Sequence, residues 1–103
     1  MRKETKIVLL TISMLSSIAI GCMANTSDGE ILFKKERCIY CHSFKGKGAH
    51  IGPDLTDIAK RRSDAWIGDQ IRNPKLHSSN PGMPGHEYLS RKQIAAIIKY
   101  LKS

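Results

Sequence analysis

Apolar side chains near the C-terminus recur at helical spacing. The stripe at i, i+3, i+4 and i+7 is formed by Ile94, Ile97, Ile98 and Leu101. Ser90 precedes it, and serine is a favoured residue for the N-cap of a helix. The pattern predicts an amphipathic helix that begins after Ser90 and runs almost to the end of the chain.

Three further segments are expected to be helical. The first spans residues 29–37 behind a cap at Ser27 or Asp28, and its inward positions are Gly29, Leu32 and Phe33. A short helix is expected over residues 56–62. A third is capped by Asp64 and ends before Pro74, with helical spacing of Trp66, Ile67, Gln70 and Ile71.

Glycine and proline mark the connections between these helices. Residues 45–52 contain three glycines, and residues 77–85 contain two prolines and two glycines, so both segments are predicted to be loops. No repeat is present. The chain is therefore expected to be all-α, with three to five helices in one small domain.

The N-terminus carries a different pattern. Residues 1–6 are basic, and residues 7–20 form an apolar run that only threonine and serine interrupt. The run is short for a membrane-spanning helix, which needs about 20 apolar residues. Charge, length and order predict a secretory signal peptide over residues 1–21.

Cys22 follows directly after the apolar run. The sequence Ala19-Ile20-Gly21-Cys22 resembles a bacterial lipobox, which implies a diacylglycerol on the Cys22 thiol after cleavage. The alternative is ordinary cleavage nearby, after Ala24, with Cys22 discarded. Under the first interpretation residues 22–27 are a lipid-anchored tether and residues 28–103 the folded domain.

Without residues 1–21 the chain has 82 residues, 14 basic and 8 acidic, so its net charge is +6. A basic balance suits nucleic acid, anionic lipid or an acidic protein. Export makes nucleic acid an implausible partner. Basic side chains gather in sequence at Lys34, Lys35, Arg37, Lys45 and Lys47. They are either an ordinary solvated surface or a ring that steers docking onto an acidic partner, an effect that salt would weaken.

The most specific motif is Cys38-Ile39-Tyr40-Cys41-His42. A C-x-x-C-H sequence is typical of c-type haem attachment: two thiols form thioethers to the porphyrin, and the histidine ligates the iron. Half a zinc site would need a second ligand pair, which the sequence lacks. A redox dithiol would need a βαβ setting, whereas the neighbouring segments indicate helices and no buried strand. A disulfide between Cys38 and Cys41 is the remaining alternative.

With these residues in place, the chain resembles a class I monohaem cytochrome c of the small bacterial type. The resemblance rests on the C-x-x-C-H motif, then Gly52-Pro53-Asp54-Leu55, then Met83-Pro84, then Tyr100-Leu101 in the last helix. It implies helices wrapped around one covalently bound haem. It also implies that Gly29 and Phe33 cross the last helix at Tyr100, and that the Pro53 carbonyl accepts the second ring N–H of His42.

Met83 is the expected sixth ligand of the iron. It is the only methionine after residue 23 and lies in a proline-stiffened loop, and a thioether stabilises ferrous iron. His86 is its competitor, and His77 and His50 are weaker candidates. In the family resembled here, a tryptophan at the position of Trp66 can donate to a haem propionate; plain packing is the alternative.

These features together predict a one-electron carrier with His42/Met83 ligation, and no enzymatic activity. The alternatives are a haem subunit of a larger redox complex and, with a labile sixth ligand, a gas sensor or small peroxidase. The expected location is the periplasmic side of a bacterial membrane, or the outer face of a Gram-positive membrane. The expected partner is an oxidase, reductase or dehydrogenase with an acidic docking surface.

Overall fold

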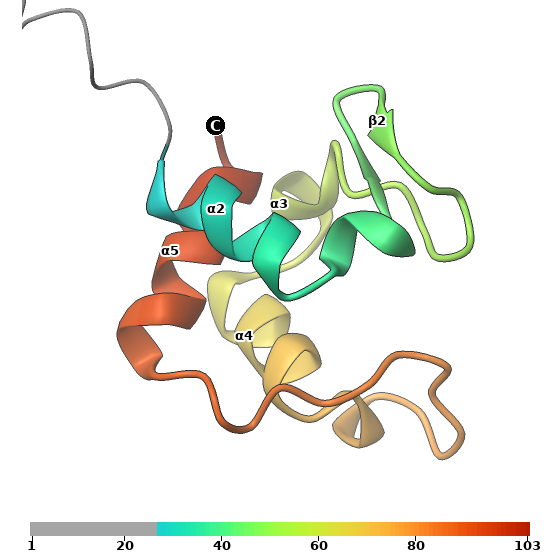
Figure 1. The fold of residues 1–103 in the computed structure, drawn as a ribbon. Coiled ribbons are helices and arrows are strands. Elements are labelled where there is room, and N and C mark those ends of the chain that lie inside the picture. Colours follow the sequence, from blue (N-terminus) through green and yellow to red (C-terminus); the bar gives the residue numbers. More distant parts are fainter. Residues whose placement is uncertain (1–26) are drawn as a thin grey trace, which may run out of the picture.

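The computed structural model describes residues 27–103, so the predicted signal peptide and Cys22 lie outside the described part. Its elements, in chain order, are α2 (Asp28–Lys35), the 3-10 turn η1 (Cys38–Tyr40), β1 (Ser43–Phe44), β2 (Lys47–Gly48), α3 (Ile58–Arg61), α4 (Asp64–Arg72), the 3-10 turn η2 (Pro74–Leu76) and α5 (Arg91–Leu101). Within this range no helix has the length and apolar character needed to cross a bilayer. The predicted all-α fold is confirmed, with helices arranged around the C-terminal one (Figure 1).

The first and last helices cross closely, and both are capped as their sequences predict. The Glu30 N–H donates to Ser27 Oγ (3.2 Å), which caps α2. Ser90 and Gln93 form a reciprocal capping box on α5, with distances of 3.1 and 2.8 Å. At the crossing, a Cβ on Gly29 would collide with the carbonyl oxygen of Ala96. Glycine is therefore what allows α2 and α5 to approach (Figure 1).

Helix α2 ends earlier than predicted. Glu36 is its C-cap, and Arg37 adopts a left-handed conformation with φ of 65°. Glycine or asparagine usually occupies such a position. Arginine does not indicate a left-handed position, and for this reason the sequence predicted a helix that extends to residue 37. The reversal at Arg37 turns the chain directly into Cys38.

Helices α3 and α4 begin at other residues than the sequence predicted. Helix α3 is a single turn, shorter than the expected 56–62. The expected cap at Asp64 on α4 is wrong: Ser63 is the cap, and its Oγ accepts from the Trp66 N–H at 3.1 Å. Two good capping residues, Ser63 and Asp64, stand side by side here, so the sequence alone did not distinguish them. The end of α4 before Pro74 is as predicted.

A two-stranded antiparallel pair follows the C-x-x-C-H motif. Ser43 pairs with Gly48 and Phe44 with Lys47, and both residues of β1 are buried. The expectation of no buried strand near the motif is therefore wrong. The connecting residues Lys45 and Gly46 have φ of 49° and 80°, as a tight hairpin with two left-handed positions requires. Strands of two residues are too short to show an alternating pattern in sequence.

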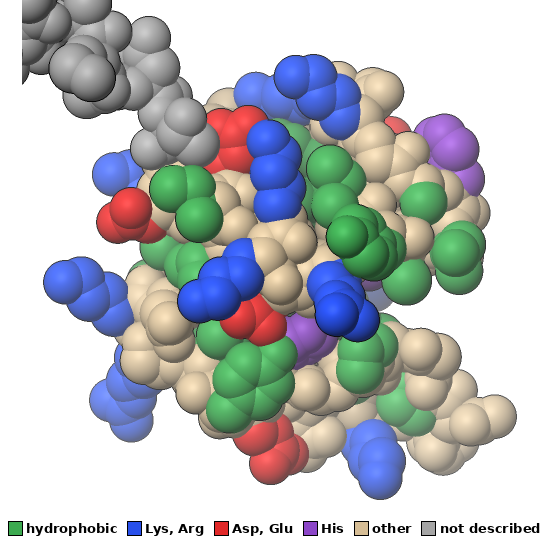
Figure 2. Space-filling view, in the orientation of Figure 1, with side chains coloured by type: hydrophobic (Ala, Val, Ile, Leu, Met, Phe, Trp, Pro, Cys, Tyr) green, Lys and Arg blue, Asp and Glu red, His purple; other side chains and the backbone are tan. Residues whose placement is uncertain are grey.

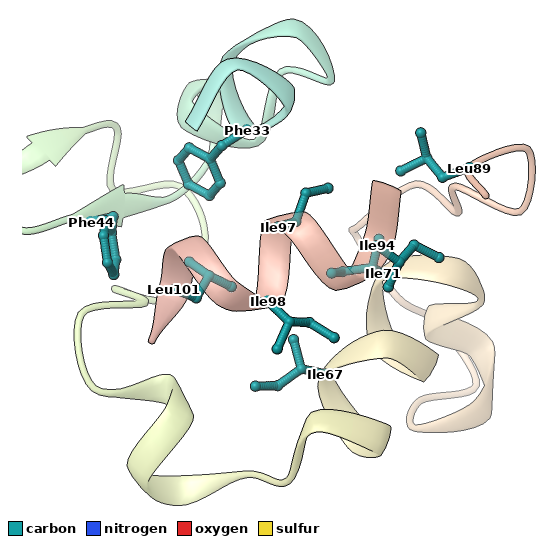
Figure 3. Close-up of a cluster of buried hydrophobic side chains, with 9 residues drawn as sticks. All are labelled: Phe33, Phe44, Ile67, Ile71, Leu89, Ile94, Ile97, Ile98 and Leu101. Carbon is teal, nitrogen blue, oxygen red and sulfur yellow. The ribbon is translucent and has the colours of Figure 1, made fainter. Parts of the chain in front are cut away.

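The core lies around α5. Its buried side chains are Phe33, Phe44, Ile67, Ile71, Leu89, Ile94, Ile97, Ile98 and Leu101 (Figure 3). The predicted stripe of α5 supplies four of them. Phe33 packs against Tyr100 with ring centroids 5.6 Å apart, at the α2–α5 crossing that the family resemblance implies. This crossing and α4 form the frame that holds the loops of the site.

Candidate functional site

A large cleft opens between the C-x-x-C-H segment and the loop before α5. Its volume is about 1030 Å³, at the upper end for ligand sites. One wall comes from η1 and residues 51–55, the other from α4 and residues 81–86. The residues that the sequence assigned to the haem site all line this cleft: Cys38, Cys41, His42, Pro53, Trp66 and Met83. Segments some forty positions apart in sequence thus face one space.

The turn η1 presents the two cysteines. The His42 N–H donates to the Cys38 carbonyl at 2.9 Å, which closes the turn across the motif. Both thiols are free, so the alternative of a Cys38–Cys41 disulfide is not what the structure contains. Burial raises the pKa of the Cys38 thiol to about 11. The reactive thiolate of Cys38 is therefore scarce at neutral pH.

The His42 ring is held in one orientation. Its Nδ1 lies 2.8 Å from the Pro53 carbonyl oxygen, which only accepts, so Nδ1 carries the proton and Nε2 keeps its lone pair. This is the contact implied by the family resemblance. A Cβ on Gly52 would stand 2.7 Å from His42 Cε1, so glycine leaves room for the ring there. With Nδ1 engaged by the Pro53 carbonyl, Nε2 is available to bind a metal ion.

These residues fit a covalently bound haem. Two free thiols stand beside an imidazole whose Nδ1 is engaged and whose Nε2 is available. The same apolar cleft contains a thioether, a second soft donor. Among residues 27–103 no group of three or more histidine, cysteine or acidic side chains could hold a bare metal ion. The donor set thus suits an iron porphyrin.

Met83 has a hydrogen-bond donor that the sequence interpretation did not assign. The Gln70 Nε2 lies 3.5 Å from Met83 Sδ, and Gln70 Oε1 lies 2.7 Å from His77 Nδ1. The roles of Gln70 and His77 were missed. Trp66 and Gln70 stand four positions apart on α4, and this shared helix face was the available signal.

The other three histidines differ in their exposure to solvent. His50 and His77 are exposed, as expected for loop residues. His86 is buried to 7% exposure and lines the cleft; its Nδ1 has no hydrogen-bond partner among the described residues. Its backbone N–H donates to the Ile71 carbonyl at 3.0 Å, which ties the loop to α4. His86 thus remains the competitor of Met83 for the sixth position.

Trp66 is half-buried, and its indole has two stacking partners. The His77 ring lies parallel to it, with centroids 4.2 Å apart and 8° between planes. Arg62 Cζ lies 4.4 Å from the indole centroid. The predicted propionate contact of Trp66 stays a prediction, while its stacking partners are now defined.

The rim of the cleft mixes apolar and basic side chains. Exposed apolar residues there include Tyr40, Ile51 and Tyr88. The clustered residues Lys34, Lys35, Arg37, Lys45 and Lys47 are all exposed, and two of them, Lys35 and Arg37, line the cleft. Figure 2 shows Lys and Arg side chains distributed among apolar ones on this face. Tyr88 donates to the Glu36 carboxylate, which joins the loop before α5 to the end of α2 and raises the pKa of Tyr88.

The helical frame, the haem-attachment motif and the oriented histidine define a c-type haem protein. The profile of the family described as Cytochrome c matches residues 26–103. The chain belongs to the cytochrome c family, and it is a class I monohaem member. Family membership establishes a haem-carrying electron-transfer module.

Three relatives are named as subunits of larger assemblies. The C subunit of nitric oxide reductase from Stutzerimonas stutzeri is 31% identical over 83 residues, which are 72% of this chain and 54% of that protein. Cytochrome c oxidase subunit 2 of Alkalihalophilus pseudofirmus is 28% identical over 85 residues, 75% of this chain and 25% of that protein. The nitric oxide reductase C subunit of Halomonas halodenitrificans is 24% identical over 94 residues, 80% of this chain and 60% of that protein. The chain thus spans 25–60% of the length of these relatives.

Proposed function

We propose that this protein is a one-electron carrier whose haem is attached through Cys38 and Cys41 and ligated by His42 and Met83. The observation that carries the proposal is the meeting of His42 and Met83 at a single apolar cleft, with His42 Nδ1 committed to the Pro53 carbonyl. The haem supplies the one-electron redox couple. The chain supplies two fixed donors, a water-poor setting and one exposed edge of the cleft.

The protein residues act on the electron transfer through position and polarity. The Pro53 carbonyl increases the basicity of the His42 imidazole and fixes its plane. The Met83 thioether favours the ferrous state, which raises the reduction potential. With both positions filled, no site remains for a substrate, so we propose a carrier and no enzyme. A gas sensor or peroxidase would need the sixth position to be labile.

Replacing Met83 with alanine tests this ligation. Met83→Ala should abolish the weak long-wavelength absorbance band of sulfur-ligated ferric haem. It should also lower the potential by on the order of 0.1 V, within the range of about 0.8 V that axial ligands span. Optical spectra and redox titration of the purified holoprotein measure both.

His86→Phe is the matched control for Met83→Ala. It keeps the aromatic volume that packs near Tyr88, where the centroids are 5.8 Å apart, and removes both ring nitrogens. The sulfur band should survive this change. Loss of the band in His86→Phe and its survival in Met83→Ala would transfer the sixth position to His86.

A second candidate function is a haem-bearing module that stays within a larger membrane redox complex. The names of the relatives, subunits of nitric oxide reductase and of cytochrome c oxidase, favour this candidate. Under either candidate, the partner is a membrane oxidase, reductase or dehydrogenase. The basic rim fits a partner with an acidic docking surface.

We propose that the protein works outside the cytoplasm, held at a membrane by lipid on Cys22. Support comes from the lipobox-like Ala19-Ile20-Gly21-Cys22 and from thioether attachment, which occurs outside the cytoplasm in bacteria. Residues 23–27 of the tether would span about 17 Å when fully stretched, at roughly 3.3–3.6 Å per residue. The haem domain would therefore stay close to the bilayer surface.

Fractionation of wild type and Cys22→Ala tests the anchor. Wild type should be in the membrane fraction, since two or three acyl chains at about 0.8 kcal/mol per buried methylene hold a protein durably. Cys22→Ala should be released. If both are soluble, or if the mass of the mature chain shows a start after Cys22 without lipid, the carrier diffuses freely.

A further inference from the structure

We propose that His77 positions Gln70 as a hydrogen-bond donor to the Met83 sulfur, and that this relay sets the reduction potential. The inference rests on the proposed ligation by Met83. The three side chains form a line: His77 Nδ1 is 2.7 Å from Gln70 Oε1, and Gln70 Nε2 is 3.5 Å from Met83 Sδ. Sulfur contacts of this length are hydrogen bonds because sulfur is large.

Hydrogen-bonding chemistry fixes the direction of the relay. Gln70 Oε1 only accepts, so His77 Nδ1 must carry the proton and donate to it. The amide NH₂ then faces the sulfur of Met83, which only accepts. The reverse amide orientation would place the carbonyl oxygen against the sulfur lone pairs. The sulfur therefore requires the orientation in which Gln70 donates, and the hydrogen bond from His77 Nδ1–H to Gln70 Oε1 holds the amide in it.

The position of His77 is itself fixed from two sides. Its ring stacks on Trp66 at 4.2 Å and 8°, and the Trp66 indole is in turn contacted by Arg62, whose Cζ lies 4.4 Å from the ring centroid. Its backbone N–H donates to the Pro74 carbonyl at 3.1 Å, at the end of η2. Although His77 is exposed, these contacts hold its ring in place, so that it can position the amide of Gln70. Gln70 is half-buried, and its other end points to the cleft.

The relay should favour the ferrous state. The positive end of the Gln70 N–H dipole faces the sulfur, and a positive potential near iron disfavours the extra charge of the ferric state. The hydrogen bond also reduces the electron donation of the sulfur. Loss of the relay should therefore lower the potential.

Redox titration of four holoproteins tests the relay: wild type, Gln70→Leu, His77→Phe and the double variant. Gln70→Leu removes the donor, and should shift the ferric-to-ferrous equilibrium about threefold toward ferric, the scale of a modest hydrogen bond. His77→Phe keeps an aromatic ring to stack on Trp66 and removes both ring nitrogens, of which Nδ1 is the one that contacts Gln70. It should shift the equilibrium in the same direction by less. The double variant should match Gln70→Leu, because His77 acts through Gln70 alone.

His50→Phe is the matched control, since it makes the same exchange at another exposed loop histidine and should leave the potential unchanged. In NMR spectra of the ferrous protein, the Gln70 amide protons should show contacts to the Met83 methyl in wild type and lose them in His77→Phe. An unchanged potential in His77→Phe, or additive shifts in the double variant, would overturn the proposal. If Met83→Ala keeps the sulfur band, the ligation itself has failed, a result separate from any failure of the relay.

Discussion

Replacing Cys38 and Cys41 together with serine should yield a chain that carries no covalent haem. Serine is nearly the same size as cysteine, but its hydroxyl forms no thioether. Haem staining after denaturing electrophoresis should fall from a clear band to none. The helical signal in circular dichroism should fall as well, because the cleft of about 1030 Å³ would lose the group that its apolar walls enclose.

Cys22→Ser is the matched control for this double variant. It makes the same exchange at the third cysteine, outside the haem motif, so the haem-stained band should remain. The single variants Cys38→Ser and Cys41→Ser each keep one thiol and should retain weak staining. A band of wild-type intensity in the double variant would show that the haem is not held by these thioethers.

Replacing Gly29 with alanine should strongly destabilise the holoprotein. The new Cβ would meet the Ala96 carbonyl oxygen and lie 2.7 Å from Tyr100 Cβ. Backbone cannot move aside as a flexible side chain can, so α2 and α5 would have to separate. The free energy of unfolding should fall by about 3 kcal/mol, the upper range of overpacking. Denaturant titration followed by circular dichroism measures this.

Gly68→Ala makes the same change at another buried helical glycine and should have the opposite effect. Its Cβ would lie 3.6 Å from Ile94 Cγ2, an ordinary contact. Alanine in place of a helix-interior glycine should then stabilise the protein by about 0.5–1 kcal/mol. Equal losses in both variants would mean that the α2–α5 crossing is not the critical approach.

The chemistry of the attachment site was predictable because its residues are close in sequence. The motif from Cys38 to His42 places both thiols and the imidazole that we propose as iron ligand within five positions. The cap at Ser90 and the apolar stripe of α5 are likewise local, since one helix turn relates each residue to the next. The all-α fold followed from such patterns.

The predictions that failed concern short elements whose shape depends on distant neighbours. Arg37 takes a left-handed φ of 65° without a residue type that signals it. The hairpin of β1 and β2 leaves no periodic pattern in two-residue strands, and its Lys45 N–H is held by Thr56 Oγ1, eleven positions away, at 2.9 Å. Tertiary contacts select these conformations.

The amino-acid sequence by itself determined the helical frame and the class of haem protein, and it predicts the attachment cysteines and the His42 ligand, because these depend on residue type and on spacing within one or two helix turns. The tertiary structure alone decided which groups meet Met83. Gln70 lies thirteen positions before Met83 and donates to its sulfur. His77, which follows η2, hydrogen-bonds the other end of the Gln70 amide. Such contacts arise only when α4 and the loop that follows pack together, since a hydrogen bond requires its donor and acceptor to be placed to within a few tenths of an ångström, which no sequence spacing encodes.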